Sequence, residues 1–405
     1  MRRLRIAALS LAVLVVTPTL TWASPTSFAG KAFDTCDTPS SATMQAWLSS
    51  PYRSVGVYFG GDGRGCKTQA NLTPSWVSAQ VSAGWHLLPL YVGRQAPCTT
   101  TQSFKMSADP AVARSQGRSE GGDAIARAGN LGLAAGTLLY NDMEHYDSSN
   151  TACRTAVLSY LTGWTERLHE SSYLSGVYSG AASGIRDLAN VYRSATYARP
   201  DVIDFAWWNN KADTDTGSYV PATYWSNHQR IHQYAGDHNE THGGRTINID
   251  SNQVDLQPAV NRDFTTYPTI RTGANGPAVS ALQYLLKDDG RDAGGVDGDF
   301  GSRTDTAVRA FQSAHGLGVD GEVGRRTWTA LLSAGWQPNL ARGSTGLEVR
   351  RLQRALTAAL GRSISIDGDF GSGTEQAVRD YQTTRGLPVD GEVGPQTWTA
   401  LQAGQ

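Results

Sequence analysis

Acidic side chains suited to acid and base catalysis occur at four places in the first 250 residues of the chain. Asp142 and Glu144 stand two residues apart in the segment LLYNDMEHY, and Asp34 and Asp250 each end a short apolar run. A neighbouring negative charge and partial burial raise the pKa of one carboxyl group while its neighbour stays ionised. Glycoside hydrolysis needs this division between two carboxyl groups. The four residues therefore predict a glycosidase site, the alternative being that they cap loops or pair with arginine.

Eight short apolar runs could hold these residues as β-strands. They cover residues 31–34, 55–59, 85–91, 137–143, 174–178, 202–207, 231–234 and 247–250, and helical stretches fit between the earlier runs at 42–49, 74–83, 120–131, 156–169 and 182–191. This alternation predicts an α/β fold, namely a (β/α)8 TIM-like barrel over residues 27–262. Residues two apart on a strand face the same side, so Asp142 and Glu144 should both point into the mouth of the barrel.

Aromatic and polar residues near the strand ends are candidates for substrate binding. Trp207 and Trp208 should alternate faces, so that one can stack on a sugar while the other packs outward. The other candidates are Asn209, Tyr178, His232, Gln233, Tyr234 and Tyr91. The histidines of this region are irregularly spaced, which favours solvated side chains over a metal site. We predict neither a metal nor a cofactor.

The beginning of the chain is typical of an exported protein. Arg2, Arg3 and Arg5 precede the apolar run 6–16, and small residues follow at 21–23, so residues 1–23 are predicted to be a signal peptide. The run is shorter than the roughly 18 to 20 apolar residues of a membrane span. We expect a secreted protein without membrane contact after cleavage, and both the general and the twin-arginine export routes stay open.

Four cysteines, Cys36, Cys66, Cys98 and Cys153, all lie in the first half of the chain. An even number in an exported protein favours two disulfides, for which three pairings are open. In a barrel, pairing between neighbouring loops is the shortest closure, which predicts Cys36–Cys66 and Cys98–Cys153.

The overall charge argues against a polyanionic partner. The formal net charge is -1, with 35 basic and 36 acidic side chains. Binding of nucleic acid through bulk charge is therefore not expected.

The last third of the chain contains an internal repeat. VDGDFGSRTDTAV from Val296 recurs as IDGDFGSGTEQAV from Ile366, and the two copies align without a gap at an offset of 70 residues. Apolar stripes at helical spacing and Asp-Gly turns predict a small three-helix module in each copy, over residues 268–334 and 338–404.

Two sets of repeat residues could be mistaken for binding sites. Phe311, Tyr381, Trp328 and Trp398 lie in the apolar stripes, which favours core packing over ligand platforms. Asp297, Asp299, Asp367 and Asp369 suggest a calcium loop, but glycine occupies the position where a third oxygen ligand belongs.

The pattern DGDFGxxTxxAVxxFQxxxGLxVDGxVGxxTWxAL closely resembles the peptidoglycan-binding domain of bacterial wall hydrolases. This resemblance covers residues 269–403 in two copies and implies anchoring to the cell wall.

The first region has a second resemblance. The segments GKAFDTCDTPS, HLLPLYVGRQAPC, LLYNDMEHY and INIDSNQVD are similar to the actinobacterial glycoside-hydrolase-like class called DUF1906, over residues 28–256. A more distant likeness to the family-25 lysozymes implies Glu144 as general acid and Asp142 as its positioning partner. The matching positions also include Asp34, Asp250 and Gln233-Tyr234, whereas His232 stands where those enzymes have tryptophan.

These inferences combine into one prediction. The chain is expected to be a secreted, cell-wall-associated and monomeric glycoside hydrolase that cleaves peptidoglycan glycan as a muramidase does and is tethered by two binding modules. The alternative is a non-catalytic wall-binding or scaffolding protein that retains a carbohydrate cleft. An amidase or peptidase would need a zinc or Cys/His site, which the sequence does not indicate.

Overall fold

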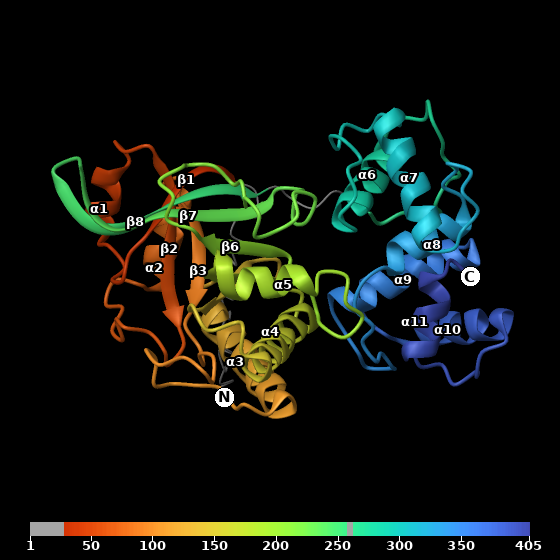
Figure 1. The fold of residues 1–405 in the computed structure, drawn as a ribbon, viewed down its shortest axis with the longest axis horizontal. Coiled ribbons are helices and arrows are strands. Elements are labelled where there is room, and N and C mark those ends of the chain that lie inside the picture. Colours follow the sequence, from red (N-terminus) through yellow and green to blue (C-terminus); the bar gives the residue numbers. More distant parts are fainter. Residues whose placement is uncertain (1–27, 257–261) are drawn as a thin grey trace, which may run out of the picture.

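The computed structural model describes residues 28–256 and 262–405, which form a closed β-barrel with surrounding helices and a separate helical region (Figure 1). The predicted signal peptide and residues 257–261 of the predicted barrel domain lie outside these residues. Within the described residues, no helix is long and apolar enough to cross a membrane.

The barrel closes in chain order. Its strands are β1 (Phe28–Asp34), β2 (Tyr52–Gly60), β3 (His86–Tyr91), β4 (Leu138–Met143), β5 (Leu174–Gly180), β6 (Val202–Ala206), β7 (Gln229–His242) and β8 (Arg245–Leu256). Alternate side chains fill the interior, among them Leu88, Leu90 and Tyr140, while Leu87 and Leu139 pack outward with the helices. This period of two follows from the pleat of the strands.

Helices cover the outside of the first six strands. They are α1 (Ser41–Trp47), α2 (Pro74–Ser82), α3 (Pro110–Asn130), α4 (Thr151–Glu170), the π-helical turn η1 (Ala181–Ile185) and α5 (Arg186–Asn190). Helix α3 begins earlier than the predicted residue 120, because the Asp109 carboxylate accepts hydrogen bonds from the backbone N–H groups of Ala111 and Val112 and Pro110 stands in the first turn. The predicted TIM-like barrel is confirmed.

The last strand corrects one part of the prediction. Strand β8 runs antiparallel to both β7 and β1, and it continues to Leu256 instead of ending at Asp250. Only the two-residue turn Gly243-Gly244 separates β7 from β8, and so short a connection cannot supply the crossover that parallel strands need. The hairpin extends beyond the barrel and packs on α1, where the Trp47 indole N–H donates to the Arg245 carbonyl (2.9 Å; Figure 1).

Both predicted disulfides are present, as Cys36–Cys66 and Cys98–Cys153. Each joins segments that follow neighbouring strands, β1 with β2 and β3 with β4. The order of strands around the barrel therefore determined the pairing.

The C-terminal region contains two three-helix modules. Module 1 consists of α6 (Pro277–Asp288), α7 (Ser302–Ala314) and α8 (Arg325–Ser333), and module 2 consists of α9 (Leu347–Leu360), α10 (Ser372–Arg385) and α11 (Pro395–Gln402). Phe311, Trp328, Tyr381 and Trp398 are all fully buried. They belong to one hydrophobic core that both modules share, so the two repeats form a single packed unit.

Candidate active site

Four acidic residues meet at one end of the barrel. Asp34 ends β1, Asp142 lies near the end of β4, Glu144 follows that strand, and Asp250 pairs with Asp34 across the β1–β8 ladder. Because β8 is antiparallel, the carboxyl end of β1 meets the first half of β8. The reversed strand thus delivers Asp250 to the mouth although it does not end there.

Asp34 is the best supported of the four carboxylates. It is 6% exposed and accepts hydrogen bonds from the Tyr58 hydroxyl (2.9 Å), the Asn252 amide (2.8 Å) and the Gln233 amide (3.3 Å). Burial raises the pKa of Asp34, and these three donors act against that rise. Gly56 makes the packing possible, since a side chain there would overlap the Asp34 side chain.

Asp142 lies deeper and has fewer partners. It is 3% exposed, and its Oδ1 atom has no hydrogen-bond partner among the described residues. Burial raises the pKa of this carboxyl group well above its ordinary range, and the charges of Glu144, Asp34 and Asp204 add to the rise. Its surroundings therefore favour the protonated form of the carboxyl group over the ionised form.

Glu144 is partly exposed, and its backbone, unlike its carboxylate, is held by a hydrogen bond. Its backbone N–H donates to Gln95 Oε1 (2.8 Å), and Gln95 Nε2 donates to the Asp142 carbonyl (2.8 Å), so one buried amide holds the strand end in place. In the part of the chain that the structure describes, the Glu144 carboxylate makes no hydrogen bond. Burial raises its pKa, and the charge of Asp250 adds to the rise. A group in this state can donate a proton.

Gln233 connects the carboxylates to an exposed aromatic side chain. Its amide N–H groups donate to Asp34 (3.3 Å) and Asp250 (3.2 Å), while its oxygen accepts from the Tyr178 hydroxyl (2.9 Å) and the Trp208 indole (3.0 Å). Trp208 is 62% exposed, a large value for an aromatic side chain beside buried charges. Gln233 therefore positions two carboxylates and one flat apolar surface together.

The other predicted binding residues lie elsewhere. Trp207 packs against Tyr219 and His232, and His232 is fully buried, with its ring nitrogens bonded to the carbonyls of Asp213 and Trp207. Tyr234 points to the same outer side as His232. Asn209 forms a local turn in which its side-chain oxygen accepts from the Lys211 N–H, outside the carboxylate cluster.

Tyr91 also faces away from the mouth. Its ring contacts Trp164 of α4, and its hydroxyl donates to Asp123 of α3 (2.8 Å). The strand period explains the difference, since Leu90 lies inside the barrel and its neighbour must therefore lie outside.

Several site residues did not emerge from the sequence. Asp204 in β6 is 4% exposed, its Oδ1 has no partner among the described residues, and burial raises its pKa well above the ordinary range. Tyr58, Asn252 and Gln95 support the acidic cluster through hydrogen bonds. A lone acid in the apolar run VIDFA was the available signal for Asp204, because alternation places it on the inner face.

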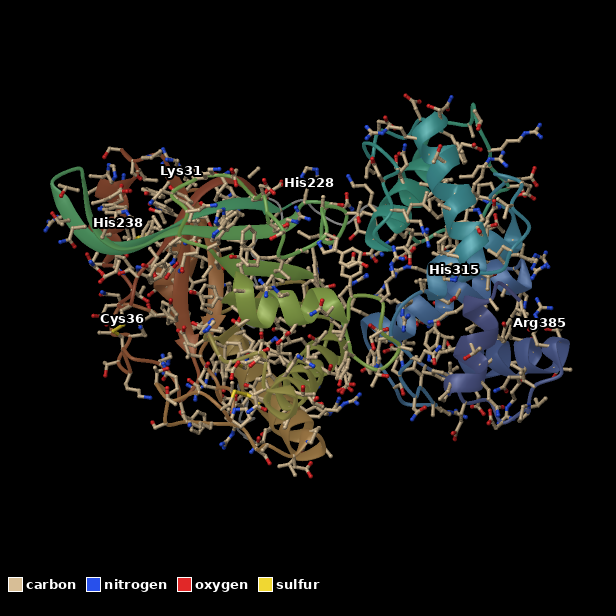
Figure 2. All side chains as sticks on the ribbon, in the orientation of Figure 1. Lys31, Cys36, His228, His238, His315 and Arg385 are labelled. Atoms are coloured by element: carbon tan, nitrogen blue, oxygen red, sulfur yellow. A yellow bond between two sulfur atoms is a disulfide. The ribbon has the colours of Figure 1, made fainter. Side chains whose placement is uncertain are left out.

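The histidines pair with acids instead of gathering around an ion. His228 contacts Asp255 (2.6 Å), and His238 and His242 contact Glu240 (3.2 and 2.8 Å). His238 lies on the extended hairpin and His228 at the other end of β7 (Figure 2). Residues 28–256 and 262–405 contain no group of three or more His, Cys, Asp or Glu that could hold a metal ion.

A buried carboxylate cluster at the mouth of a TIM-like barrel, followed by two repeated helical modules, defines the class of glycoside hydrolase-like proteins with wall-binding modules. Residues 45–254, just over half of the chain, match the Rv2525c-like, glycoside hydrolase-like domain, and the chain belongs to this family. Residues 275–331 and 345–401 match the peptidoglycan binding domain. The protein is thus hydrolase-like and associated with the cell wall.

Individual relatives cover parts of the molecule. The zinc D-Ala-D-Ala carboxypeptidase of Streptomyces albus G is 38% identical over 68 residues, which are 16% of this chain and 27% of that protein. The Tat-secreted protein Rv2525c of Mycobacterium tuberculosis has a TM-score of 0.40 at 14% identity, covering 57% of this chain and 97% of that one. The modular autolysin LytC of Streptococcus pneumoniae has a TM-score of 0.36 at 12% identity, covering 55% and 46%.

Proposed function

We propose that this protein is a secreted glycoside hydrolase that cleaves the glycan of bacterial peptidoglycan beside N-acetylmuramic acid. The observation that carries the proposal is the cluster of Asp34, Asp142, Glu144 and Asp250, in which Glu144 has a raised pKa, is partly exposed, and makes no side-chain hydrogen bond within the described residues. Such a group can protonate the oxygen of a leaving sugar.

The remaining carboxylates divide the other tasks. Three hydrogen-bond donors favour the ionised form of Asp34, and Asp250, whose pKa burial raises to about 6, carries negative charge at neutral pH. Negative charge beside the sugar ring stabilises the oxocarbenium-like transition state. Asp142, which is buried on the strand that leads into Glu144, is assigned the role of a positioning group.

Substrate contact is assigned to Trp208. Its exposed indole offers a flat apolar face for a sugar ring, and its N–H is held by Gln233 Oε1 (3.0 Å), so the ring is positioned before substrate arrives. Tyr178 bonds to the same oxygen (2.9 Å) and limits the movement of Gln233.

The two modules are assigned to retention on the wall. Tethering to an insoluble polymer raises the local concentration of the scissile bonds at the barrel without adding any contact to the active site. Because the modules share their own hydrophobic core, residues 269–405 can be tested as one fragment. This fragment should sediment with purified walls, and equal partitioning with and without walls would contradict the assignment.

Incubation of the mature protein with purified walls from several bacteria tests the catalytic proposal. We expect new reducing ends and, by mass spectrometry, muropeptides that end in free muramic acid. Fragments that end in N-acetylglucosamine would redirect the proposal to a different linkage. Wall binding without any released sugar would favour the non-catalytic wall-binding protein.

A further inference from the structure

The two modules expose the same groove to different degrees. In module 1, a cavity of about 600 Å³ is lined by Asn275, Gly276, Pro277, Ser280, Asp297, Gly298 and Asp299. The 70-residue offset places Thr345, Gly346, Leu347, Arg350, Asp367, Gly368 and Asp369 at the matching positions of module 2. Gly346 is buried whereas Gly276 is half-buried, and Leu347 is half-buried whereas Pro277 is exposed. Something covers one rim of the groove in module 2.

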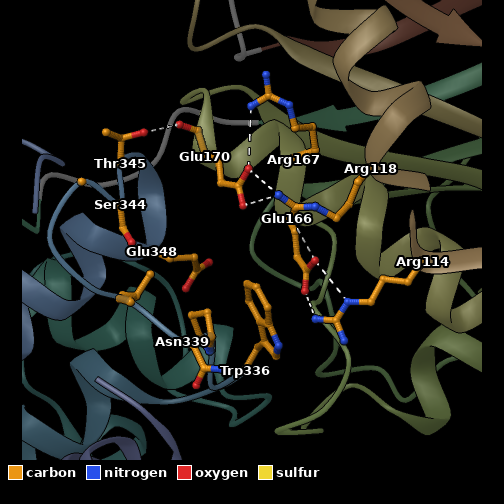
Figure 3. Close-up of a pocket in the computed structure, with 13 residues that line it drawn as sticks. Arg114, Arg118, Glu166, Arg167, Glu170, Trp336, Asn339, Ser344, Thr345 and Glu348 are labelled. Atoms are coloured by element: carbon orange, nitrogen blue, oxygen red, sulfur yellow. Dashed lines mark hydrogen bonds and ion pairs between the residues drawn. The ribbon is translucent and has the colours of Figure 1, made fainter. Parts of the chain in front are cut away.

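The C-terminal end of the barrel helix α4 covers this rim. The Thr345 hydroxyl donates to the Glu170 carbonyl (3.1 Å), and the Glu348 carboxylate bonds to His169 Nδ1 (3.1 Å). A methyl group added to Gly346 would overlap the His169 carbonyl oxygen, so the two backbones are in direct contact. Figure 3 shows Thr345 beside Glu170 in this seam, which encloses a cavity of about 370 Å³.

On the barrel side, hydrogen bonds within the barrel hold His169 in place. His169 is 6% exposed, and its Nε2 atom bonds to Asp201 (2.8 Å), which also accepts from the Ser175 N–H (2.7 Å). The imidazole therefore lies between one carboxylate of the barrel and one of module 2. The charge of these two carboxylates outweighs burial and raises the pKa of His169 to about 10.

The two repeats differ in sequence at the positions that make this contact. Glu348 corresponds to Ala278, and Arg351, which holds Glu348 at 2.7 Å, corresponds to Ala281. Arg350 corresponds to Ser280, and it crosses the groove to donate to the Ile366 carbonyl (2.8 Å). Module 2 thus carries the side chains that bind the barrel and fill its groove, and module 1 carries small ones.

Module 1 touches the barrel through a different surface. Asp288 at the end of α6 pairs with Arg199 (2.8 Å), and the Tyr192 hydroxyl donates to the Asp288 carbonyl (2.7 Å). This contact lies at the opposite end of α6 from Gly276 and Pro277, so it leaves the groove open.

The docked surface also lies away from the acidic cluster. His169 precedes β5 and Asp201 precedes β6, whereas the acidic cluster lies at the carboxyl ends of the parallel strands. Docking of module 2 therefore leaves the mouth of the barrel uncovered.

From this asymmetry we infer that the repeats have different tasks: the groove face of module 2 is a docking surface for helix α4 of the barrel, and module 1 alone presents its groove to the wall. The second half of this inference rests on the proposed wall binding. The first half is independent of it, so the two can fail separately.

A matched pair of glycine variants tests docking in the full chain. Gly346 and Gly276 have similar positive φ values, 98° and 102°, so alanine strains both backbones equally. Only the methyl group at position 346 meets the barrel, because nothing lies within 4 Å of one at position 276. Amide hydrogen exchange at residues 166–172 should therefore quicken about tenfold or more in Gly346→Ala and stay unchanged in Gly276→Ala, a difference that reports local opening.

The same readout has a second variant and a clear contrary result. Glu348→Ala installs the residue that module 1 carries at this position, and it should also quicken exchange at residues 166–172. If neither Gly346→Ala nor Glu348→Ala alters exchange there, the docking surface is wrong.

A second matched pair tests the division of wall binding. Asp299 and Asp369 are both exposed and stand at equivalent positions of the two grooves. In co-sedimentation with purified walls, Asp299→Lys should weaken binding of the full chain about tenfold, and Asp369→Lys less than twofold. Equal losses would overturn the division of tasks. Failure of the unaltered protein to bind walls would overturn the wall assignment, and the exchange experiment would still decide whether module 2 is docked.

Discussion

Aspartates have opposite environments in the barrel mouth and in the C-terminal modules. Asp34, Asp142 and Asp250 are packed beside one another, and burial raises the pKa of each. The aspartates of the module turns accept one backbone N–H and one glutamine amide each, at 2.7 to 2.9 Å, and their pKa values are lowered; they are Asp297, Asp320, Asp367 and Asp390.

The difference shows that the surroundings of an aspartate decide whether it stabilises a turn or serves in a candidate catalytic site. In a module turn, two donors satisfy an exposed carboxylate, so its charge stabilises the fold. At the barrel mouth, burial exceeds the supply of donors, and Asp142 Oδ1 has no partner within the described residues. Buried carboxyl groups with too few donors lower the stability of the fold at neutral pH. Carboxyl groups with pKa values shifted in this way are common in catalytic sites.

The largest expected effect comes from Glu144. Glu144→Gln keeps the shape of the side chain and removes the transferable proton, so release of reducing ends from walls should fall about 10²- to 10⁴-fold. Co-sedimentation with walls should stay unchanged, because the modules lie elsewhere. Asp390→Asn, in a turn of module 2 outside the groove, is the matched control, and it should leave the turnover of each folded molecule unchanged. Equal rates for Glu144→Gln and the unaltered enzyme would show that another group donates the proton.

A smaller effect, on stability, is expected in module 2. Gln353 is fully buried, donates to Asp367 (2.7 Å) and the Asp369 carbonyl (3.1 Å), and accepts from the Gly368 N–H (2.9 Å). Gln353→Ala leaves these groups without partners and should lower the free energy of unfolding by about 2 to 4 kcal/mol. Chemical denaturation followed by tryptophan fluorescence measures the change. The exposed Gln376→Ala should cost less than about 0.5 kcal/mol.

The pH dependence of stability should distinguish the two environments next. The pKa of Asp250 is raised to about 6, so its contribution to stability is complete below its unfolded value of 3.8 and is lost as the pH rises through about 6. At pH 7, Asp250→Asn should therefore have a free energy of unfolding about 1 to 2 kcal/mol larger than that of the unaltered protein, after allowance for solvent screening, and a higher melting temperature. Both differences should vanish near pH 3.8. A constant advantage at every pH would contradict this assignment.

The smallest effect, with the opposite sign, is expected at Asp367. Hydrogen bonds from the Asp369 N–H and Gln353 lower its pKa, so its contribution is present above the ordinary value of 3.8 and is lost as the pH falls below it. Asp367→Asn should lower the melting temperature slightly at pH 7 and not at all near pH 2. A gain in stability at pH 7 would erase the contrast between the module turns and the barrel mouth.

Most of the barrel followed from local patterns, and its errors have identifiable causes. The apolar runs marked all eight strands because buried strands need continuous or alternating apolar residues. The direction of β8 was missed because direction depends on the length of the preceding connection, and β7 continues through residues that carry no apolar pattern. The predicted helix is shorter than α3 because the first turns of α3, near Asp109, are polar and exposed.

Within the site, the sequence predicted which residues take part better than it predicted their hydrogen-bond partners. The acids were visible because aspartate and glutamate at strand ends are unusual in an apolar context. Its residue type predicts Gln233 as a substrate contact, yet its amide bonds to Asp34, Asp250, Tyr178 and Trp208. A glutamine that joins residues 17 to 199 positions away has no sequence signal, because such contacts form only when the barrel closes.

The sequence by itself determined the repeat, the helical modules, the strand positions and the identity of the acidic residues, because each depends on residue type and spacing within a few tens of positions. Only the tertiary structure decided that Asp250 meets Asp34 through a reversed strand, that Gln233 links the carboxylates to Trp208, and that α4 covers the groove of module 2. These features are contacts between segments distant in the chain. Their geometry depends on barrel closure and domain packing, which no local pattern encodes.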